Sequence, residues 1–598
     1  MEMTRKKIDE RLSALRSFMC ENGIDAFVFP STDPHNGEYV PDHWKGREWI
    51  SGFDGSAGTA VVTAHGAALW TDSRYFIAAA QQLEHTEYVL MRQGLDDTPT
   101  IVQWLSRQLQ DCRHRRVGID GMVCSASMVE DLRNELSAEN GIEVVTSYDP
   151  LSVIWNDRPP LPADRIVVHP LEYAGEDTAS KLSRIRDAVE ASHADGIMVS
   201  ALDDIAWVLN LRGNDVHCNP VFVSYLYIGR HDAVLFVDPA KVDDEVMDYL
   251  HGIGVETDSY DHVVEAMRRR RDLHVLADPS QVNHTLFAAM GNHVVAAPSP
   301  IAAMKAVKNE VEIEGYRRAM LRDGVAMVKF LAWLGPAVEE GHQTECSIDE
   351  KLTSLRAEQE GFRGLSFDTI AGYADHGAIV HYEATKATDA TLRPEGFLLL
   401  DSGAQYVDGT TDITRTIALG PITDEMRKVY TLVLKGHIRL QMLKFPDGAC
   451  GSQLDAVARA PLWAEGLNFL HGTGHGVGAY LNVHEGPHQI RMEWKPAPLR
   501  AGMTVTDEPG IYVEGKFGVR VENTLLISPY MTTPFGRFLQ FEPLTLCPID
   551  LNPVDWSLLD AEEKAWLNGY HLMVRERLSP FLSDHERQWL HEATRHVE

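Results

Sequence analysis

Four acidic residues in the second half of the 598-residue chain stand beside apolar, strand-like runs, where a carboxylate is uncommon. They are Asp401, Asp412, Glu508 and Glu522. A charge within a buried strand must be paired with another charge, protonated or bound to a metal ion. These four residues are therefore the first candidates for a chemically active site.

The first two carboxylates belong to neighbouring predicted strands. Residues 397–401 form one strand that ends in Asp401, and residues 411–415 form a second strand that carries Asp412. An Asp-Gly turn at residues 408–409 lies between them and is typical of a β-hairpin. A hairpin would bring both carboxylates to one neighbourhood, although the sequence leaves its register open.

The other candidate ligands lie further along the chain. Glu508 follows the apolar strand predicted at residues 503–506. The period-two pattern of the next strand puts Arg520 and Glu522 on one face, where Arg520 would orient the carboxylates. His475 lies in a glycine-rich stretch that we expect to be flexible and able to bring an imidazole close to a crowded site.

Four carboxylates that converge without compensation would repel one another and raise each other's pKa. Two divalent cations would cancel their charge, and oxygen donors with one imidazole suit manganese, cobalt or zinc. Two such ions, about 3.5–4 Å apart, can share a bridging water, lower its pKa and hold an attacking hydroxide. The residue types therefore predict the centre of a hydrolase.

Charge and motif spacing exclude other classes of function. The chain has 55 basic and 87 acidic side chains, so its formal net charge is −32. This charge repels nucleic acids and anionic membrane surfaces, and neither is an expected partner. The alternating glycines of residues 472–478 lack the spacing of a dinucleotide-binding loop, and no suitable P-loop is present.

Two stretches of the N-terminal half repeat one pattern. Each has a helical periodicity, then a glycine turn, then a strand; the stretches are residues 8–29 and 181–199. We infer two related α/β domains in tandem. Proline-rich segments at residues 155–162 and 298–300 predict boundaries after each of them. The predicted domains are therefore 1–156, 157–304 and 305–598.

In the last predicted domain, glycine-rich turns alternate with Val/Thr/Leu-rich strands and further helices, a pattern that favours an α+β fold with antiparallel strands. We expect a long amphipathic helix over residues 308–334 and further helices over 424–443 and 452–466. Pro461 would kink the last of these helices. The fold class predicted for the whole chain is α/β plus α+β.

Cysteine usage and hydropathy indicate a soluble cytoplasmic protein. The seven cysteines show no zinc-site spacing and are expected to be free thiols. The first twenty residues lack the apolar region of a signal peptide. No uninterrupted run of about 18 apolar residues could span a membrane.

The order and context of the five candidate ligands resemble those of the creatinase/aminopeptidase pita-bread metallopeptidases. Within that family the chain looks like the large, three-domain, cytosolic Xaa-Pro aminopeptidases (aminopeptidase P). The stretches that carry this resemblance are residues 400–406, 408–412, 471–476, 482–487 and 506–510, together with 69–76 and 201–207 outside the last domain. The resemblance therefore covers most of the chain.

The resemblance implies a fold and a set of metal ligands. Two creatinase-N-like domains would precede a pita-bread catalytic domain. Asp401 would bind one metal ion, Asp412 and Glu522 would bridge both ions, and His475 and Glu508 would bind the second. The implied cofactor is a pair of divalent ions, manganese first, with cobalt or zinc as alternatives.

The resemblance also implies residues that act on the substrate. His381 and His484 would steady the scissile carbonyl or the developing tetrahedral centre, and His471 would be a third histidine of the pocket. Glu508 would pass a proton to the leaving proline nitrogen, which carries no hydrogen of its own and must be protonated. Arg74 would contact substrate from the N-terminal domain of a neighbouring subunit.

We therefore expect an exopeptidase that removes an N-terminal residue ahead of a penultimate proline, with such peptides as its partners and a homodimer as its assembly. One alternative is a prolidase, which cleaves only Xaa-Pro dipeptides; the two additional domains favour the aminopeptidase. The other is a catalytically dead pita-bread module that binds proteins. Such modules lose metal ligands, whereas all five are present here.

Overall fold

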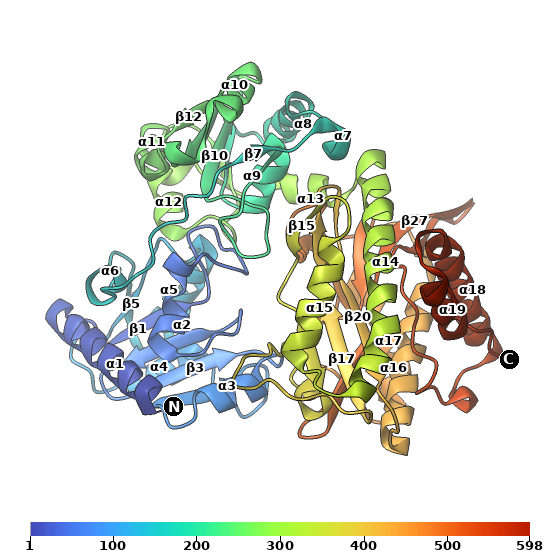
Figure 1. Ribbon diagram of the computed structural model, residues 1–598. Coiled ribbons are helices and arrows are strands. Elements are labelled where there is room, and N and C mark those ends of the chain that lie inside the picture. The colour runs from blue at the N-terminus through green and yellow to red at the C-terminus, as the bar shows by residue number, and fades with distance from the viewer. Residues whose placement is uncertain (1) are drawn as a thin grey trace. The chain divides into compact units, whose positions relative to one another are not determined.

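The computed structural model describes the backbone of residues 2–598 and the side chains of 6–138 and 141–598. The chain forms two compact units. The first contains the chain up to His169 and Glu176–Ile301, and the second contains Pro170–Gly175 and Ala302–Glu598. In Figure 1 the first unit is mainly blue and green, and the second runs from yellow-green to red. The two predicted domain boundaries, after residues 156 and 304, stay a prediction.

The first unit contains a six-stranded mixed sheet in the order β4-β3-β2-β1-β5-β6. Its strands are β1 (Ala26–Pro30), β2 (Thr59–Thr63), β3 (Ala67–Thr71), β4 (Tyr88–Arg92), β5 (Arg116–Ile119) and β6 (Glu143–Val145). Phe27 and Phe29 pack with Leu12 of the N-terminal helix, whereas Val28 packs on the opposite face with Leu105. Period-two alternation therefore buries both faces of β1 against helices.

A second six-stranded sheet of the same unit has the order β12-β11-β10-β8-β13-β14. Its strands are β8 (Gly196–Val199), β10 (Ser224–Gly229), β11 (Ala233–Val237), β12 (Glu256–Asp258), β13 (Val275–Ala277) and β14 (Val295–Ala296). Strand for strand, the order and the parallel or antiparallel sense repeat those of the first sheet. The expected pair of related α/β folds is confirmed.

Helices cover these sheets, and a small pair of strands lies beside them. The helices are α1 (Glu2–Asn22), α2 (Gly46–Ser51), α3 (Phe76–Gln82), α4 (Ile101–Gln108), α5 (Ala126–Asn140), α6 (Leu151–Ile154), α8 (Thr178–Ala191), α9 (Leu202–Leu209), α10 (Asp244–Gly252), α11 (Val263–Arg269) and α12 (His284–Ala289). The small pair is β7 (Val167–Val168) and β9 (Leu211–Arg212). The first helix ends at Asn22, directly before Gly23, which has φ +63°, and this agrees with the glycine turn that the sequence predicts.

The second unit is α+β, as predicted. Its helices are α7 (Leu171–Ala174), α14 (Glu310–Glu340), α15 (Glu345–Ala357), α16 (Asp424–Met442), α17 (Asp455–Trp463), α18 (Ala561–Leu578) and α19 (Asp584–Ala593), and α13 (Pro300–Ala306) leads into it. Its strands are β15 (Phe362–Leu365), β16 (Ile370–Tyr373), β17 (Phe397–Ser402), β18 (Ala404–Tyr406), β19 (Gly409–Thr410), β20 (Ile413–Ala418), β21 (Lys444–Pro446), β22 (Gly474–Gly476), β23 (Glu485–Ile490), β24 (Thr504–Asp507), β25 (Gly510–Val513), β26 (Phe517–Arg520), β27 (Asn523–Thr533) and β28 (Gly536–Pro543).

Strand β17 is packed between helices and carries Asp401 at its end. Leu398 and Leu400 lie in a core with α14 and α15, whereas Phe397 lies in the core that contains α16. Because side chains alternate along a strand, Asp401 lies on the face of β17 opposite to Leu400. In Figure 1, α14 and α15 lie across the strands β17 and β20.

The three helices expected in this unit are present with shifted bounds. The long helix begins at Glu310 because Asn309 caps it, and it continues to Glu340. The helix expected at residues 452–466 is shorter, since α17 begins at Asp455 and ends at Trp463, with Pro461 in its last turn. The proline has no N–H to donate to the helix, which limits its continuation.

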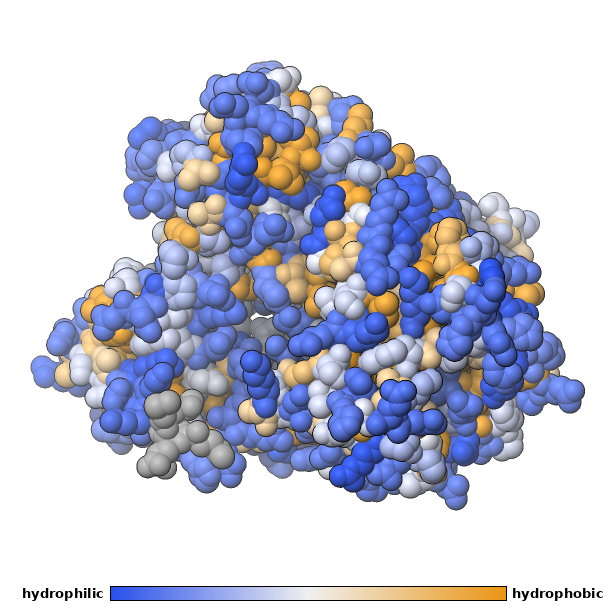
Figure 2. Space-filling view, viewed as in Figure 1, coloured by the Kyte–Doolittle hydropathy of each residue, from blue (hydrophilic) through white to orange (hydrophobic). Residues whose placement is uncertain are grey.

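The surface is consistent with the acidic composition. Figure 2 shows hydrophilic residues over most of the visible face, with hydrophobic residues in separate groups among them. Within residues 2–598, none of the helices has both the length and the apolar composition that crossing a bilayer requires. None of the seven cysteines forms a disulfide in the described part of the chain.

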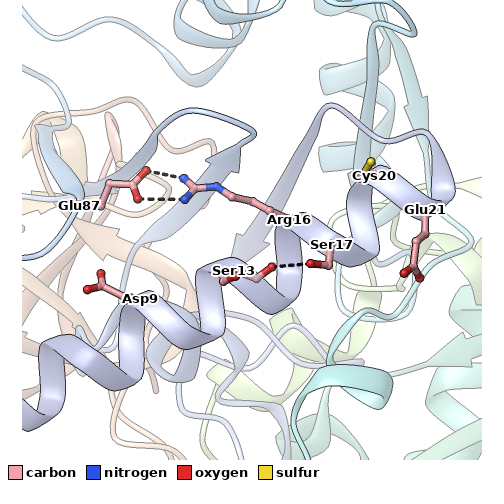
Figure 3. A pocket seen from close by; sticks show the side chains of 7 residues that line it. All are labelled: Asp9, Ser13, Arg16, Ser17, Cys20, Glu21 and Glu87. Atoms are coloured by element: carbon pink, nitrogen blue, oxygen red, sulfur yellow. Dashed lines mark hydrogen bonds and ion pairs between the residues drawn. The ribbon is translucent and has the colours of Figure 1, made fainter.

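A shallow depression beside α1 is lined mostly by polar side chains. Figure 3 shows that Arg16 bridges to both carboxylate oxygens of Glu87, and that the Ser17 hydroxyl donates to the Ser13 carbonyl. Cys20 and Glu21 project from the next turn, away from that ion pair. The charged groups Arg16 and Glu87 of this depression are therefore paired with each other at the surface of the first unit.

The surroundings of two helical glycines in the second unit predict opposite effects of substitution by alanine on stability. A Cβ at Gly436 in α16 would collide with the carbonyl of Ala458 in α17, whereas Gly569 in α18 has open space around it. We expect Gly436→Ala to destabilise the protein by about 2 kcal/mol or more, because overpacking outweighs helix propensity. Gly569→Ala should stabilise it by about 0.5–1 kcal/mol.

Urea unfolding of the two variants and the parent, followed by far-UV circular dichroism, would measure both effects. A Gly436→Ala midpoint equal to that of the parent would contradict the close contact between α16 and α17.

Candidate metal centre

Three predicted ligands come together in the second unit. One ligand atom each of Asp412, His475 and Glu522 lies within 4.8 Å of the other two. Asp412 directly precedes β20, His475 is in β22, and Glu522 lies between β26 and β27. Three segments that are distant in sequence therefore place their ligand atoms around one point.

Glu508 belongs to the same cluster through His475. The His475 Nε2 atom lies 3.4 Å from Asp412 Oδ2 and 3.6 Å from Glu508 Oε1. The other ring nitrogen, Nδ1, donates a hydrogen bond of 2.9 Å to the Gly476 carbonyl. This hydrogen bond fixes the tautomer and turns the Nε2 lone pair toward the carboxylates, as in histidines that bind metals.

Asp401 reaches the cluster through Arg520. Its Oδ2 atom accepts a hydrogen bond of 2.7 Å from Arg520 Nη2. Its Oδ1 atom is buried and has no hydrogen-bond partner among residues 2–598. A buried carboxylate oxygen without a partner is costly and is expected where a ligand completes the site.

The electrostatics of the cluster fit cations. Burial, followed by the charges of Asp401 and Glu508, raises the pKa of Asp412 well above its ordinary value. Burial, followed by the charges of Asp412 and Glu508, raises the pKa of Glu522 in the same way. The site therefore holds more negative charge than its protein neighbours balance, and the oxygen-rich donor set fits a pair of divalent ions.

Arg520 links the carboxylates to one another. Besides Asp401, it contacts Thr414 Oγ1 at 3.3 Å, and the Thr414 hydroxyl donates to Glu522 Oε2 at 2.7 Å. Arg520 Nη1 also donates to the Tyr512 hydroxyl at 2.6 Å. The expected proximity of Arg520 to the carboxylates is present, and Thr414 and Tyr512 extend the network.

The predicted histidines lie beside this network. The rings of His484 and His475 are 4.4 Å apart at 78°. His471 donates through Nδ1 to the Gly472 carbonyl, so its Nε2 accepts from the Tyr512 hydroxyl at 2.8 Å. His381 follows Val380, whose carbonyl accepts from Arg520 at 3.3 Å.

Arg74 lies in the first unit. It donates to Asp72 at 2.8–2.9 Å and approaches Glu38 at 3.4 Å. These two carboxylates hold the guanidinium on the loop between β3 and α3. Its contact with substrate stays a prediction.

Part of the glycine-rich stretch, which we expect to be flexible, forms a paired strand in the structure. Residues Gly474–Gly476 form β22, which pairs antiparallel with β23. A Cβ at Gly474 would collide with the Thr506 carbonyl, and one at Gly476 would lie against the Glu485 carbonyl. The glycines on both sides of His475 therefore allow close packing of the backbone there.

The strand expected over residues 519–524 is also interrupted. It breaks at Val521 and Glu522, between β26 and β27. The Glu522 N–H donates instead to the Thr414 carbonyl at 3.1 Å. Asp412 likewise precedes its strand, which begins at Ile413. Both ligands therefore lie outside the regular strand pairing, and for Glu522 the contact with the distant Thr414 replaces that pairing.

Two residues beside the site, Thr414 and Tyr512, were not predicted from the sequence. Thr414 follows Asp412 by two residues, so the period-two pattern could have placed both on one face. Tyr512 lies two residues after Gly510 in an ordinary strand pattern, and no local signal marks its hydroxyl as a partner of Arg520.

Family models match nearly the whole chain. Metallopeptidase family M24 matches residues 314–529, and the C-terminal region of peptidase M24 matches residues 537–597. Two models of a creatinase/prolidase N-terminal domain match residues 11–150 and 157–312. All the residues of the candidate metal centre lie within the M24 match.

Similar proteins extend the match to the full length. Aminopeptidase P1 of Arabidopsis thaliana is 39% identical, with 99% of each chain covered, and a probable Xaa-Pro aminopeptidase P of Laccaria bicolor is 41% identical, with 97% of this chain and 92% of the relative covered. The X-prolyl aminopeptidase of Caenorhabditis elegans, described as a cytosolic enzyme with a di-nuclear active site, is 35% identical, with 99% and 100% covered and a TM-score of 0.95.

These matches confirm the predicted fold class, two creatinase-N domains with a pita-bread domain. The chain belongs to metallopeptidase family M24, among its aminopeptidase P members.

Proposed function

We propose that this chain is a two-metal aminopeptidase that removes the N-terminal residue from peptides with proline in second position. The observation that carries the proposal is the convergence of Asp412, His475 and Glu522, with Glu508 beside them. The relatives named aminopeptidase P match the chain over its full length, which supports the same reaction here.

We propose the ligand set that the donors support. Asp401 would hold one ion, Asp412 and Glu522 both ions, and His475 with Glu508 the other. When bound, two divalent cations would neutralise the carboxylates and lower the pKa of the attacking water. Manganese is the proposed ion, and the same donor set also suits cobalt or zinc.

The positions of the side chains around the ligands support separate roles in proton transfer, substrate orientation and ligand positioning. The Glu508 side chain is 19% exposed, so its carboxyl can exchange a proton with a substrate that enters from solvent. The leaving proline nitrogen needs this proton because it has no hydrogen of its own. We propose that His381 and His484 orient the scissile carbonyl, while Arg520 holds Asp401 in place.

His471 and Arg74 have weaker support. The Tyr512 hydroxyl connects His471 to Arg520, so we propose that His471 shapes the substrate pocket from behind this network. Arg74, in the first unit, is proposed to contact the peptide from an N-terminal domain of a neighbouring subunit. Asp72 and Glu38 hold its guanidinium in place.

The two alternatives have less support. The Xaa-Pro dipeptidase of Bacillus anthracis shares the fold, at 24% identity and a TM-score of 0.51, but it covers only 63% of this chain. The additional sheet-forming region favours an enzyme for longer peptides. A dead binding module is disfavoured because all five candidate ligand residues are present in the sequence, and the ligand atoms of Asp412, His475 and Glu522 lie within 4.8 Å of one another.

We also propose three domains, 1–156, 157–304 and 305–598, supported by the separate family matches. We also propose the cytoplasm as its location, since one relative is described as cytosolic, and a homodimer as its assembly, which only the resemblance in sequence implies. Sedimentation velocity on the purified chain would test the dimer, since a species of one chain mass at all concentrations would contradict it.

Peptide hydrolysis tests the proposed reaction. We expect the manganese-loaded protein to release arginine from Arg-Pro-Pro, and Asp412→Asn to reduce kcat/KM by about 1,000-fold or more, because several kcal/mol of electrostatic stabilisation are removed. Asp447→Asn is the control, since Asp447 pairs with Arg500 outside the centre and should leave the rate unchanged. Activity restricted to Gly-Pro would indicate a prolidase, and none on either peptide a binding module.

Metal removal tests the cofactor. Dialysis against a chelator should abolish hydrolysis of Arg-Pro-Pro, and adding back Mn²⁺, Co²⁺ or Zn²⁺ singly would rank the ions. Elemental analysis of the reconstituted parent should find two ions per chain, and Asp412→Asn should bind fewer. A parent that retains no transition metal after reconstitution would contradict the two-metal site.

A further inference from the structure

Glu345, in the first turn of α15, is a fully buried carboxylate surrounded by donors. Its Oε1 atom accepts from the Tyr373 N–H at 2.8 Å, and its Oε2 atom accepts from the Ala390 N–H at 3.0 Å and the Tyr382 hydroxyl at 2.8 Å. His376 Nδ1 lies 2.9 and 3.0 Å from the two oxygens. One side chain therefore binds four separate positions of the chain.

These positions enclose one segment, residues 374–390. Tyr373 directly precedes the segment, and Ala390 closes it. Tyr382 lies within the segment directly after His381, the histidine proposed to face the substrate. Glu345 thus fixes both ends of the segment and the residue next to His381.

The opposite side of the segment contacts the network of the metal centre. Its 3-10 helix, Ala374–Ala378, packs directly on β26, where a Cβ at Gly518 would collide with the Gly377 carbonyl. The Val380 carbonyl accepts from Arg520 at 3.3 Å. The segment is therefore held between Glu345 on one side and the strand of Arg520 on the other.

His376 and Tyr382 form the contact between Glu345 and the interior of the segment. Their ring centroids lie 4.5 Å apart with the planes tilted by 31°, so the rings are in contact while both bind the same carboxylate. The hydrogen bond with Glu345 raises the pKa of His376 against the effect of its partial burial, and Asp375 adds to the increase. The imidazolium that this pKa favours pairs with the buried carboxylate.

We propose that Glu345 is a positioning residue for the peptidase reaction, which through Tyr382 and His376 holds His381 at the substrate. The inference rests on the proposed function, because it needs a substrate that His381 contacts. Glu345 itself would touch neither the peptide nor the metal ions. Burying a carboxylate costs free energy unless hydrogen bonds compensate it. The four donors that bind Glu345 all lie in or directly beside residues 374–390, so the buried carboxylate holds this one segment.

Glu345→Gln tests the proposal. An amide offers one accepting oxygen and one NH₂ group, so in either orientation its NH₂ would face a backbone N–H, of Tyr373 or of Ala390. We expect kcat/KM on Arg-Pro-Pro to fall by about tenfold or more, since small misplacements of catalytic groups are costly. Two ions per chain should remain bound, because no metal ligand changes.

A double-mutant cycle with His381→Ala separates positioning from general damage. If Glu345 acts through His381, Glu345→Gln should reduce kcat/KM by less than about twofold when His381 is already alanine. If the two losses multiply in the double variant, Glu345 does not act through His381 and the proposal is wrong.

Asp323→Asn is the matched control. Asp323 is likewise buried and accepts from Arg356 Nε at 2.9 Å and from the Tyr406 hydroxyl at 3.1 Å, but it does not bind residues 374–390. It should lower thermal stability and leave kcat/KM within about twofold of the parent. If Glu345→Gln behaves like Asp323→Asn in both measurements, its role is structural and the proposal fails.

A milder variant and a second measurement remain if Glu345→Gln does not fold. Tyr382→Phe removes only the hydroxyl that binds Glu345 and should give a smaller fall in kcat/KM, again lost in the His381→Ala background. In Tyr382→Phe, amide hydrogen exchange should be faster than in the parent, and only within residues 374–390. Unchanged exchange and unchanged kcat/KM would overturn the proposal.

Failure of the proposed function would look different. In that case the parent and the Asp323→Asn control would both leave Arg-Pro-Pro intact. If only the inference fails, the parent hydrolyses the peptide and the Glu345 variants follow the control.

Discussion

Repulsion among buried carboxylates is the constraint on which the catalytic region depends. The charges of Asp401, Asp412, Glu508 and Glu522 act on one another, and burial together with these charges raises the pKa of Asp412 and of Glu522 well above their ordinary values. Within the described residues, Arg520 supplies a positive charge that bonds directly to one of them. The fold therefore holds together a set of groups that repel one another unless cations compensate their charge, and the elements around the site oppose that repulsion.

The elements resist it through long-range contacts rather than through regular strands. Glu522 leaves the strand ladder and binds Thr414 through both its backbone and its side chain. His475 is fixed by β22, where glycines allow two backbones to approach closely. Glu345 holds the segment with His381 from the opposite side. Rigid support on several sides is what a preorganised catalytic site requires.

Much of this arrangement could be predicted from the sequence, because it depends on local patterns. The unusual carboxylates, the period-two strands and the repeated helix-turn-strand pattern identified the ligand candidates and the tandem α/β folds. The break at Val521, the role of Gly474 and the partners of Glu345 could not be predicted. Each depends on which distant backbone lies opposite, and a single sequence does not encode that in its local periodicity.

The two six-stranded sheets of the first unit share their strand order and the sense of every pairing. Such correspondence is what tandem duplication of one ancestral coding segment produces. After duplication only one copy must preserve the original contacts, and its sibling can acquire new surface residues. The N-terminal half thus contains its own evolutionary comparison, in which differences between equivalent strands mark where the two copies have specialised.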